Sequence, residues 1–279
     1  MQLTSQNKIV VSGTHVERYK YTNAFYFGSR EANTTTQQRE EESAEDRERR
    51  LEISRKQNAY RCQANFVRIV KANQNRHPNT KGKYFHTFVT LTYRDNETDV
   101  AKAQRDFAKF IQRLNYKQLK AKKTELKYIG VIEFQERGAI HFHVLFFNLE
   151  RIDNTTRAKH LDKLWGHGDA NIKGIQSIER SSKYMAKYLV KSFMDKRLYR
   201  KKKFFCASNM YRPHTIINES AIKIIHERVL DHHVHIKSYS YHSAFLGEVF
   251  VYLYEIPHKE LDVLFFEEPP PINETYDDW

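Results

Sequence analysis

The sequence predicts an α+β fold, and three of its features support this prediction. Stretches rich in β-branched and aromatic residues, which favour strands, lie at residues 84–93, 128–134 and 139–147. Apolar residues recur three and four positions apart in residues 100–119, which predicts an amphipathic helix. The polar residues 135–138 leave only a short connection between two of the strands, which is typical of an antiparallel hairpin.

The other elements are assigned in chain order. Residues 23–27 suggest a short strand, and residues 36–58 carry opposite charges three or four apart, as solvated helices do. The remaining predicted elements are helices at 155–165 and 181–194 and strands at 169–178 and 246–256.

The domain organisation is expected to centre on residues 59–213. Residues 1–58 are an N-terminal extension with a charged helix, and residues 214–264 are a C-terminal extension that could pack on the same domain. Residues 265–279 are acidic and rich in proline, which predicts a disordered tail.

Composition favours a polyanionic partner. The chain has 279 residues, with 47 Lys and Arg against 34 Asp and Glu, a formal net charge of +13, which points to nucleic acid. Its two cysteines, Cys62 and Cys206, do not form the C-x-x-C pattern of a zinc ribbon. With no basic leader and no apolar run long enough to cross a bilayer, we expect no membrane association and a place in the cytoplasm of a bacterial host. The sequence has no phosphate-binding G-x-x-x-x-G-K-[ST] loop, which argues against a built-in helicase.

A candidate metal site lies in the stretch Ile140–Val144, where His141 and His143 are separated by one residue. Residues two apart on a strand share a face, so both imidazoles point the same way. Glu133 on the preceding strand could complete a ligand set for Mg²⁺ or Mn²⁺, with Zn²⁺ as an alternative ion. Gln135 and Glu136, which lie at the turn, are alternative third ligands. Alone, the two histidines more often pack or form hydrogen bonds.

A candidate nucleophile lies on the predicted helix 181–194. Tyr184 and Tyr188 are four residues apart and therefore share a helix face, with Lys187 and Lys191 three residues beyond each. A tyrosine hydroxyl has a pKa of about 10, so attack on phosphorus requires a metal ion and a nearby cation. A tyrosine at the buried edge of an amphipathic helix is the simpler interpretation of this segment alone.

Three segments together resemble the rolling-circle replication initiators of the HUH endonuclease superfamily. Phe88–Tyr93 is similar to their first motif, Ile140–Val144 to their His-hydrophobe-His motif, and Tyr184–Lys191 to their tyrosine motif in its two-tyrosine form. The motifs occur in the family order, and the resemblance covers roughly residues 60–213 of the chain.

The resemblance implies a central antiparallel β-sheet flanked by helices, related to the RRM-like fold. It implies metal ligation by His141 and His143, with Glu133 as third ligand, and nucleophilic attack by Tyr184 or Tyr188 with lysine assistance. The residues that we expect to act on DNA are then the catalytic Tyr184, Tyr188, Lys187 and Lys191 and the DNA-binding Thr90, Thr92, Arg200, Lys201, Lys202 and Lys203. Phe204 and Phe205, which follow the basic run, are expected in the core.

The function implied is a site- and strand-specific DNA nickase and ligase that initiates rolling-circle replication of a phage or plasmid. Its intermediate is a 5′-phosphotyrosine, its cofactor Mg²⁺ or Mn²⁺, and its partners single-stranded DNA at an origin with a host helicase and DNA polymerase. A transposase or relaxase of the same superfamily is one alternative. A non-catalytic RRM-like nucleic-acid-binding protein, for which metal would be irrelevant, is another.

Overall fold

The described part of the chain forms two compact units. The computed structural model describes residues 3–27, 43–78, 86–119, 125–149, 154–175, 178–198, 201, 204–257 and 260. One unit spans residues 36–212, and the other joins residues 1–35 to residues 213–279. The boundary expected at residue 58 falls inside the helix α1 (Ala44–Asn73), which belongs to the first unit. The tail 265–279 lies outside the described residues.

The larger unit is built on a five-stranded sheet with the order β6-β3-β5-β4-β7. Every pair of neighbouring strands in it is antiparallel. Its strands are β3 (Thr87–Thr92), β4 (Tyr128–Phe134), β5 (Ile140–Phe146), β6 (Ala170–Gly174) and β7 (Phe204–Cys206). Its helices are α1, α2 (Val100–Leu119), α3 (Asn154–Trp165) and α4 (Ile178–Met194), with a short 3₁₀ turn at Lys196–Leu198. The expected α+β fold with an antiparallel sheet flanked by helices is confirmed.

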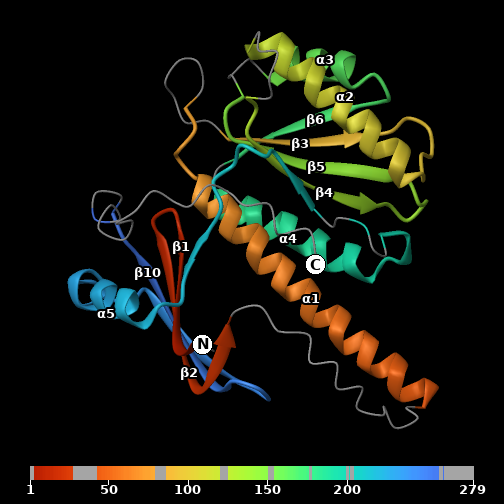
Figure 1. The fold of residues 1–279 in the computed structure, drawn as a ribbon. Helices are drawn as coiled ribbons and strands as arrows, with labels where there is room; N and C mark the ends of the chain where they lie inside the picture. The colour runs from red at the N-terminus through yellow and green to blue at the C-terminus, as the bar shows by residue number, and fades with distance from the viewer. Residues whose placement is uncertain are drawn as a thin grey trace. The chain divides into compact units, whose positions relative to one another are not determined.

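The two faces of this sheet carry separate hydrophobic cores because alternate residues of each strand point to opposite sides. The first core packs β-strand residues such as Val89, Ile140 and Phe142 against α2 and α3, where Phe110 and Trp165 are fully buried. Figure 1 shows these two helices on one side of the sheet and α1 and α4 on the other.

The second core lies between the sheet and the helices α1 and α4. Phe66 of α1 and Leu189 of α4 are fully buried there with Val131 of β4. Phe204 packs against this core and Phe205 against the first one, so both take the core position that was expected of them. The faces of the sheet are therefore closed by apolar packing, except where polar residues replace apolar ones along the strands.

One predicted strand ends earlier than expected. The sequence pattern predicts a strand over residues 169–178, but β6 ends at Gly174 and Ile178 already begins α4. The apolar spacing of Ile172, Ile175 and Ile178 fits both a strand and the approach to a helix, and glycine within such a run weakens a strand.

The smaller unit contains a second sheet that the sequence pattern does not reveal. Its strand order is β8-β1-β2-β10-β9, and all its neighbouring pairs are antiparallel. Its elements are β1 (Leu3–Ser12), β2 (His15–Phe27), β8 (His214–Ile216), α5 (Glu219–Arg228), a 3₁₀ turn (Leu230–His232), β9 (Lys237–Ser243) and β10 (Gly247–Glu255). The helix α5 packs Ile222 and Ile225 on one face of the sheet, against Ile9 and Val16.

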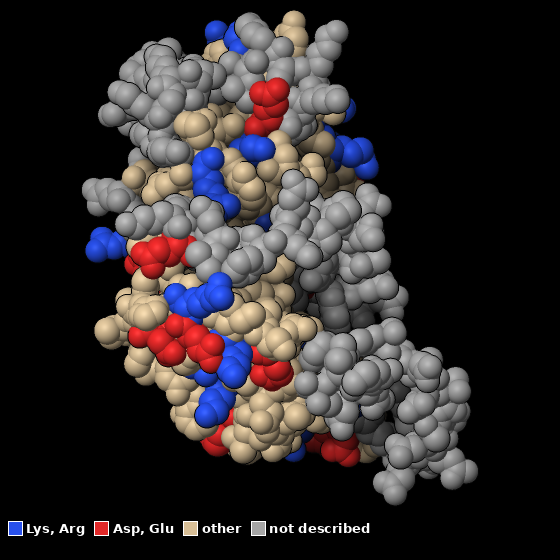
Figure 2. Space-filling view, turned by 60° about the vertical axis from the view of Figure 1, so that its left-hand side comes forward, with Lys and Arg blue, Asp and Glu red and all other residues tan. Residues whose placement is uncertain are grey.

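Charged side chains are mixed on the surface. Figure 2 shows Lys and Arg interspersed with Asp and Glu over the described residues of the face in view. On this face the net charge of +13 does not gather into one broad basic patch. Among the described residues, no helix combines the length and the apolar character needed to cross a lipid bilayer.

Candidate active site

Three possible metal ligands meet on the face of the larger sheet that α4 covers. Glu133 on β4 lies directly opposite His141 on β5, and Thr92 on β3 lies opposite His141 on the other side. Directly opposite residues in an antiparallel pair have adjacent side chains on one face. One ligand atom from each of Glu133, His141 and His143 lies within 4.8 Å of the others. The short hairpin between β4 and β5 sets this register.

The hydrogen bonds of His143 fix its orientation. Its Nε2 lies 2.7 Å from Glu133 Oε2, and its Nδ1 lies 3.2 Å from Thr90 Oγ1. A carboxylate only accepts hydrogen bonds, so Nε2 carries the proton in this arrangement and Nδ1 accepts from the Thr90 hydroxyl. When Nε2 is needed as a ligand, the proton must move to Nδ1, and Thr90 Oγ1 can accept it there because a hydroxyl works in both directions.

The imidazole of His141 is buried without a partner. Its Nε2 has no hydrogen-bond partner among the described residues, and the side chain is only 8% exposed. Burial, the charge of His143 and the charge of Arg137 lower the pKa of His141, so that its neutral form, which binds metals, is favoured. A buried polar atom usually has a partner. The orphaned nitrogen beside a carboxylate and a second imidazole therefore fits a divalent cation.

The carboxylate of Glu133 is held in its ionised form. Burial alone would raise the pKa of Glu133, but hydrogen bonds from His143 and Lys191 outweigh it, and the net pKa is lowered. Lys191 Nζ lies 3.2 Å from Glu133 Oε1, on the oxygen that His143 does not contact. The two alternative ligands lie elsewhere, because Gln135 Oε1 accepts a hydrogen bond from Arg137 Nε and Glu136 is exposed at the turn.

The helix α4 brings both tyrosines to the ligand group. The ring of Tyr188 stacks on the ring of His143, with centroids 4.4 Å apart and planes 16° apart. Phe88 stacks against the same imidazole, with centroids 5.8 Å apart. The Tyr184 ring meets Tyr188 edge-on at 5.1 Å and Phe88 at 6.0 Å. An amphipathic helix packed over the sheet by Met185 and Leu189 thus places Tyr184 and Tyr188 over the histidines.

The two tyrosines differ in exposure and in charge preference. Tyr184 is 44% exposed, and the Tyr188 hydroxyl donates a hydrogen bond to the Tyr184 hydroxyl. Burial, this hydrogen bond and the charge of Glu133 raise the pKa of Tyr188 above its ordinary value. Of the two lysines on this helix, Lys191 contacts the ligand group through Glu133, while Lys187 is exposed.

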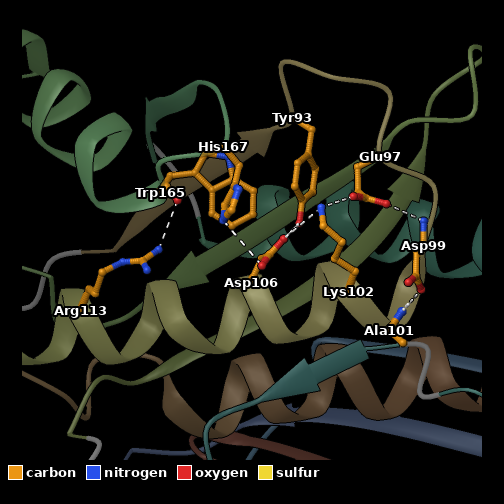
Figure 3. Close-up of polar contacts among 9 residues, drawn as sticks. All are labelled: Tyr93, Glu97, Asp99, Ala101, Lys102, Asp106, Arg113, Trp165 and His167. Carbon is orange, nitrogen blue, oxygen red and sulfur yellow. Dashed lines mark hydrogen bonds and ion pairs between the residues drawn. The ribbon is translucent and has the colours of Figure 1, made fainter.

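The end of β3 beside His141 is held by a network that the sequence pattern does not identify. Figure 3 shows Tyr93, Asp106 and His167 with Trp165 above α2. The Tyr93 hydroxyl donates to Asp106 Oδ2 at 3.1 Å, and His167 Nε2 lies 3.7 Å from Asp106 Oδ1. Trp165 Nε1 donates to the carbonyl oxygen of Thr92 at 2.9 Å. The segment Trp165–Gly168 therefore fixes the backbone of the strand that carries Thr90 and Thr92.

Not every residue expected to bind DNA can be placed. Arg200, Lys202 and Lys203 lie outside the described residues, and Lys201 is exposed between them. The Thr90 hydroxyl contacts His143, and the Thr92 side chain lies beside His141 in the register. The sequence pattern did not point to Thr90 as a partner of His143, and the alternation shared by β3 and β5 is the signal from which it could have been found.

The ligand group has the composition of a catalytic metal site. Two imidazole nitrogens and one carboxylate oxygen leave coordination positions open for water and a phosphate oxygen, which suits Mg²⁺, Mn²⁺ or Zn²⁺. Two aromatic hydroxyls stand beside it on α4.

Comparison with known proteins agrees with these residues. No curated protein and no solved structure matches the chain. A family model for the replication-associated protein ORF2 matches residues 86–193, a segment that contains β3, the ligand group and α4. This match confirms the resemblance seen in the sequence: residues 86–193 are similar to this family of replication-associated proteins, consistent with a rolling-circle replication initiator.

Proposed function

We propose that this chain is a metal-dependent, site- and strand-specific DNA nickase and strand transferase that initiates rolling-circle replication of a phage or plasmid. The observation that carries the proposal is the stacking of Tyr188 on His143 at 4.4 Å, which joins the tyrosine helix to the ligand group. The family match over residues 86–193 supports a role in replication. The proposed substrate is single-stranded DNA at a replication origin.

Glu133, His141 and His143 are proposed to hold Mg²⁺ or Mn²⁺. Such an ion polarises a phosphodiester and neutralises charge that develops on its oxygens. The surrounding residues prepare the ligands for this task. Thr90 orients His143 through its Nδ1, and Lys191 favours the ionised carboxylate of Glu133.

Tyr184 is proposed as the first nucleophile because it is the more exposed tyrosine. Its hydroxyl loses a proton to solvent, and its oxygen forms a bond to phosphorus while the bond from phosphorus to the 3′ oxygen breaks. The leaving oxygen takes up a proton and becomes the free 3′-OH that a polymerase extends. The hydrogen bond from the Tyr188 hydroxyl stabilises the negative charge on the Tyr184 oxygen during this attack.

The phosphotyrosine bond keeps the free energy needed to rejoin the strand. A 3′-OH attacks the phosphotyrosine, the phosphodiester forms again, and the tyrosine hydroxyl is released. Tyr188 lies on the same helix face, so it is proposed to make the second cut while Tyr184 still carries the strand. Exposed Lys187 on α4 is proposed to contact a phosphate, and strand unwinding is assigned to a host helicase.

The test is the covalent adduct itself. Purified protein is incubated with a randomised single-stranded oligonucleotide pool, labelled at the 3′ end, with Mn²⁺ or with EDTA. We expect an SDS-resistant labelled band in Mn²⁺ alone, with a nucleotide on the peptide that contains Tyr184. Sequencing of the trapped strands should show enrichment of one sequence around the cleaved position.

Three variants and one control separate the possible outcomes. Tyr184→Phe is expected to lower the initial rate of adduct formation by about a hundredfold or more, and the double variant with Tyr188→Phe should give none. Tyr116→Phe, which alters a 63% exposed tyrosine on α2, should behave as wild type. An adduct that persists in the double variant would overturn the nucleophile assignment. Binding of the pool without any adduct in wild type would favour the non-catalytic RRM-like alternative.

A further inference from the structure

Arg137 occupies an unusual position at the rim of the ligand group. It lies in the turn between β4 and β5, and its guanidinium turns back towards the end of β3. Its Nε donates to Gln135 Oε1 at 3.0 Å, and its Nη2 donates to the carbonyl oxygen of Tyr93 at 3.3 Å. Asn96 Nδ2 donates to the Arg137 carbonyl oxygen at 3.0 Å. The side chain therefore spans from the hairpin turn to the residue after Thr92.

This path carries the guanidinium past the start of β5, where His141 is paired with both Thr92 and Glu133. The positive charge of Arg137 contributes to the lowered pKa of His141, after burial and His143, which agrees with this proximity. The guanidinium thus stands at the edge of the ligand group, and its backbone is fixed from the β3 side by Asn96.

Arg137 differs from the neighbouring cations in its partners. Arg197 pairs with Asp195, 2.6 Å from its Nη2, and lies 3.6 Å from the centre of the Phe134 ring. Lys191 pairs with Glu133. The two hydrogen bonds of the Arg137 guanidinium go to neutral oxygens.

A guanidinium has five N–H donors, and these two bonds leave three without an acceptor among the described residues. An exposed, oriented guanidinium with its charge unmatched by a described carboxylate is arranged to receive an anion. Guanidinium groups bind phosphate oxygens with two parallel N–H bonds.

We propose that Arg137 binds the phosphodiester next to the one that is cut, and so sets how the DNA strand enters the site. This inference rests on the proposed nickase function for its choice of ligand. The strand would pass over the β4–β5 turn, with one phosphate on Arg137 and the next at Glu133, His141 and His143. Gln135 and Asn96 act as positioning residues, because they hold the Arg137 side chain and backbone.

The experiment measures DNA binding separately from the chemistry. Fluorescence anisotropy of labelled dT20 is recorded in EDTA over a series of KCl concentrations, for wild type, Arg137→Gln, Arg137→Lys and Arg47→Gln. Arg47 is an exposed arginine in the first turn of α1 and is the matched control. Thermal unfolding of each variant is recorded as a check on folding.

The two Arg137 variants have different expected results. Arg137→Gln removes one phosphate contact, so the slope of log K against log salt should become less steep by about 0.7. Its affinity at low salt should fall by roughly tenfold. Arg137→Lys keeps the charge and the salt slope but loses the two-pronged geometry, so its affinity should fall by about threefold. Arg47→Gln should remain within about twofold of wild type at a rim position of this kind.

Each outcome decides the matter. Unchanged affinity and slope in Arg137→Gln, or an equal loss in Arg47→Gln, overturns the proposal and leaves the nickase proposal standing. A loss specific to Arg137 without any tyrosine adduct in wild type supports the phosphate contact and removes the nickase function instead. Should Arg137→Gln not fold, Arg137→Lys decides, because wild-type binding by that variant contradicts the two-pronged contact.

Discussion

The imidazole of His143 shows how several neighbours prepare one side chain. Phe88 and Tyr188 lie on its ring faces, Thr90 contacts Nδ1, and Glu133 contacts Nε2. The stacked rings restrict rotation of the imidazole, and the hydrogen bonds orient its two nitrogens. His141 has none of this support at Nε2 among the described residues. The two histidines therefore differ in what they contribute to the stability of the metal-free protein.

The first prediction concerns these two histidines. Without metal, His141→Leu should raise the free energy of unfolding by on the order of 1 kcal/mol, because it removes a buried polar atom that lacks a described partner. His143→Leu should lower it by about 1–2 kcal/mol, because Glu133 loses its partner at 2.7 Å. Urea unfolding followed by circular dichroism in EDTA measures both values.

Adding Mn²⁺ gives the matching control. Wild type should become more stable as the free ion concentration rises, while both variants lose most of this gain because each lacks a ligand. If His141→Leu were as destabilising as His143→Leu in EDTA, the unpartnered state of His141 would be the wrong description of the metal-free site.

Part of the site could be predicted from residue spacing alone. The alternation of His141 and His143, and the short turn that follows Glu133, are local features, so they set a shared face and a register without further information. The stacking of Tyr188 on His143 and the reach of Arg137 to Tyr93 depend on how α4 rotates over the sheet and on side-chain torsions. Local sequence patterns do not specify those quantities.

At the scale of elements, glycine at the end of α3 sets how β3 is joined to β6. A Cβ atom on Gly168, at φ +155°, would overlap the carbonyl oxygen of Thr92 and lie 2.6 Å from the nitrogen of Arg94. Both are backbone atoms, which cannot rotate away. The neighbouring Gly166, at φ +75°, would bring its Cβ no closer than 4.0 Å to the oxygen of Lys163. The two glycines are thus needed for different reasons.

The second prediction compares these glycines. Gly168→Ala should lower the free energy of unfolding by about 3 kcal/mol or more, because the backbone of β3 must move. Gly166→Ala should cost only about 1–2 kcal/mol, the penalty for an L-residue in the left-handed region. Urea denaturation gives both values. Similar costs for the two variants would show that close approach to Thr92 is not the constraint at Gly168.

The C-terminal end of α1 carries a buried histidine that links stability to pH. Asn73 Oδ1 accepts from the backbone nitrogen of Tyr211 and from His77 Nε2, which therefore carries the proton. Burial, with the charges of Lys127 and Arg76, lowers the pKa of His77 to about 4. The neutral imidazole is the form that this site accommodates.

The third prediction follows from that lowered pKa. Between about pH 6.5 and pH 4 the unfolded chain binds the proton and the folded one does not, so stability falls as the pH falls through this window. The loss for His77 is at most about 3 kcal/mol. His77→Gln keeps a donor for Asn73 and should flatten this part of the pH profile in urea unfolding. An unchanged profile would show that His77 is protonated in the folded state.

Sequence patterns identified the elements of the larger unit better than those of the smaller one. The helix 100–119 and the strand 128–134 match α2 and β4 at both ends, because each has a continuous periodic pattern. β1 and β2 were missed as a pair, although they form a hairpin closed by Gly13 at φ +64°. Their polar and charged residues alternate irregularly, and much of their burial depends on β10, at the other end of the chain.

At the scale of the whole molecule, the two ends of the chain build one sheet. β2 pairs with β10 from Tyr21↔Val249 to His15↔Glu255, and β1 pairs with β8 from Ile9↔Ile216 to Val11↔His214. No local pattern announces such a pairing, because the partners are separated by the entire larger unit. The described ligand group and both tyrosines belong to residues 36–212 alone.

The fourth prediction follows from this division. Both hydrophobic cores of the larger unit draw their residues from positions 66 to 210, so a fragment of residues 36–212 should fold and keep the Mn²⁺-dependent adduct. A fragment of residues 1–212 keeps β1 and β2 but lacks β8, α5, β9 and β10. An isolated hairpin is marginal in water, and this one would expose Ile9, Val16 and Tyr19, which are buried in the full chain.

We therefore expect the longer fragment to behave worse than the shorter one. On size-exclusion chromatography the 1–212 fragment should aggregate, because unpaired strand edges and exposed apolar side chains promote association. The 36–212 fragment should elute as a compact species with a near-ultraviolet circular dichroism spectrum. If the shorter fragment lacked fixed tertiary structure, its cores would need the second sheet. If the longer fragment were the better behaved, the hairpin would have a role within the larger unit rather than in the sheet that it forms with the C-terminal strands.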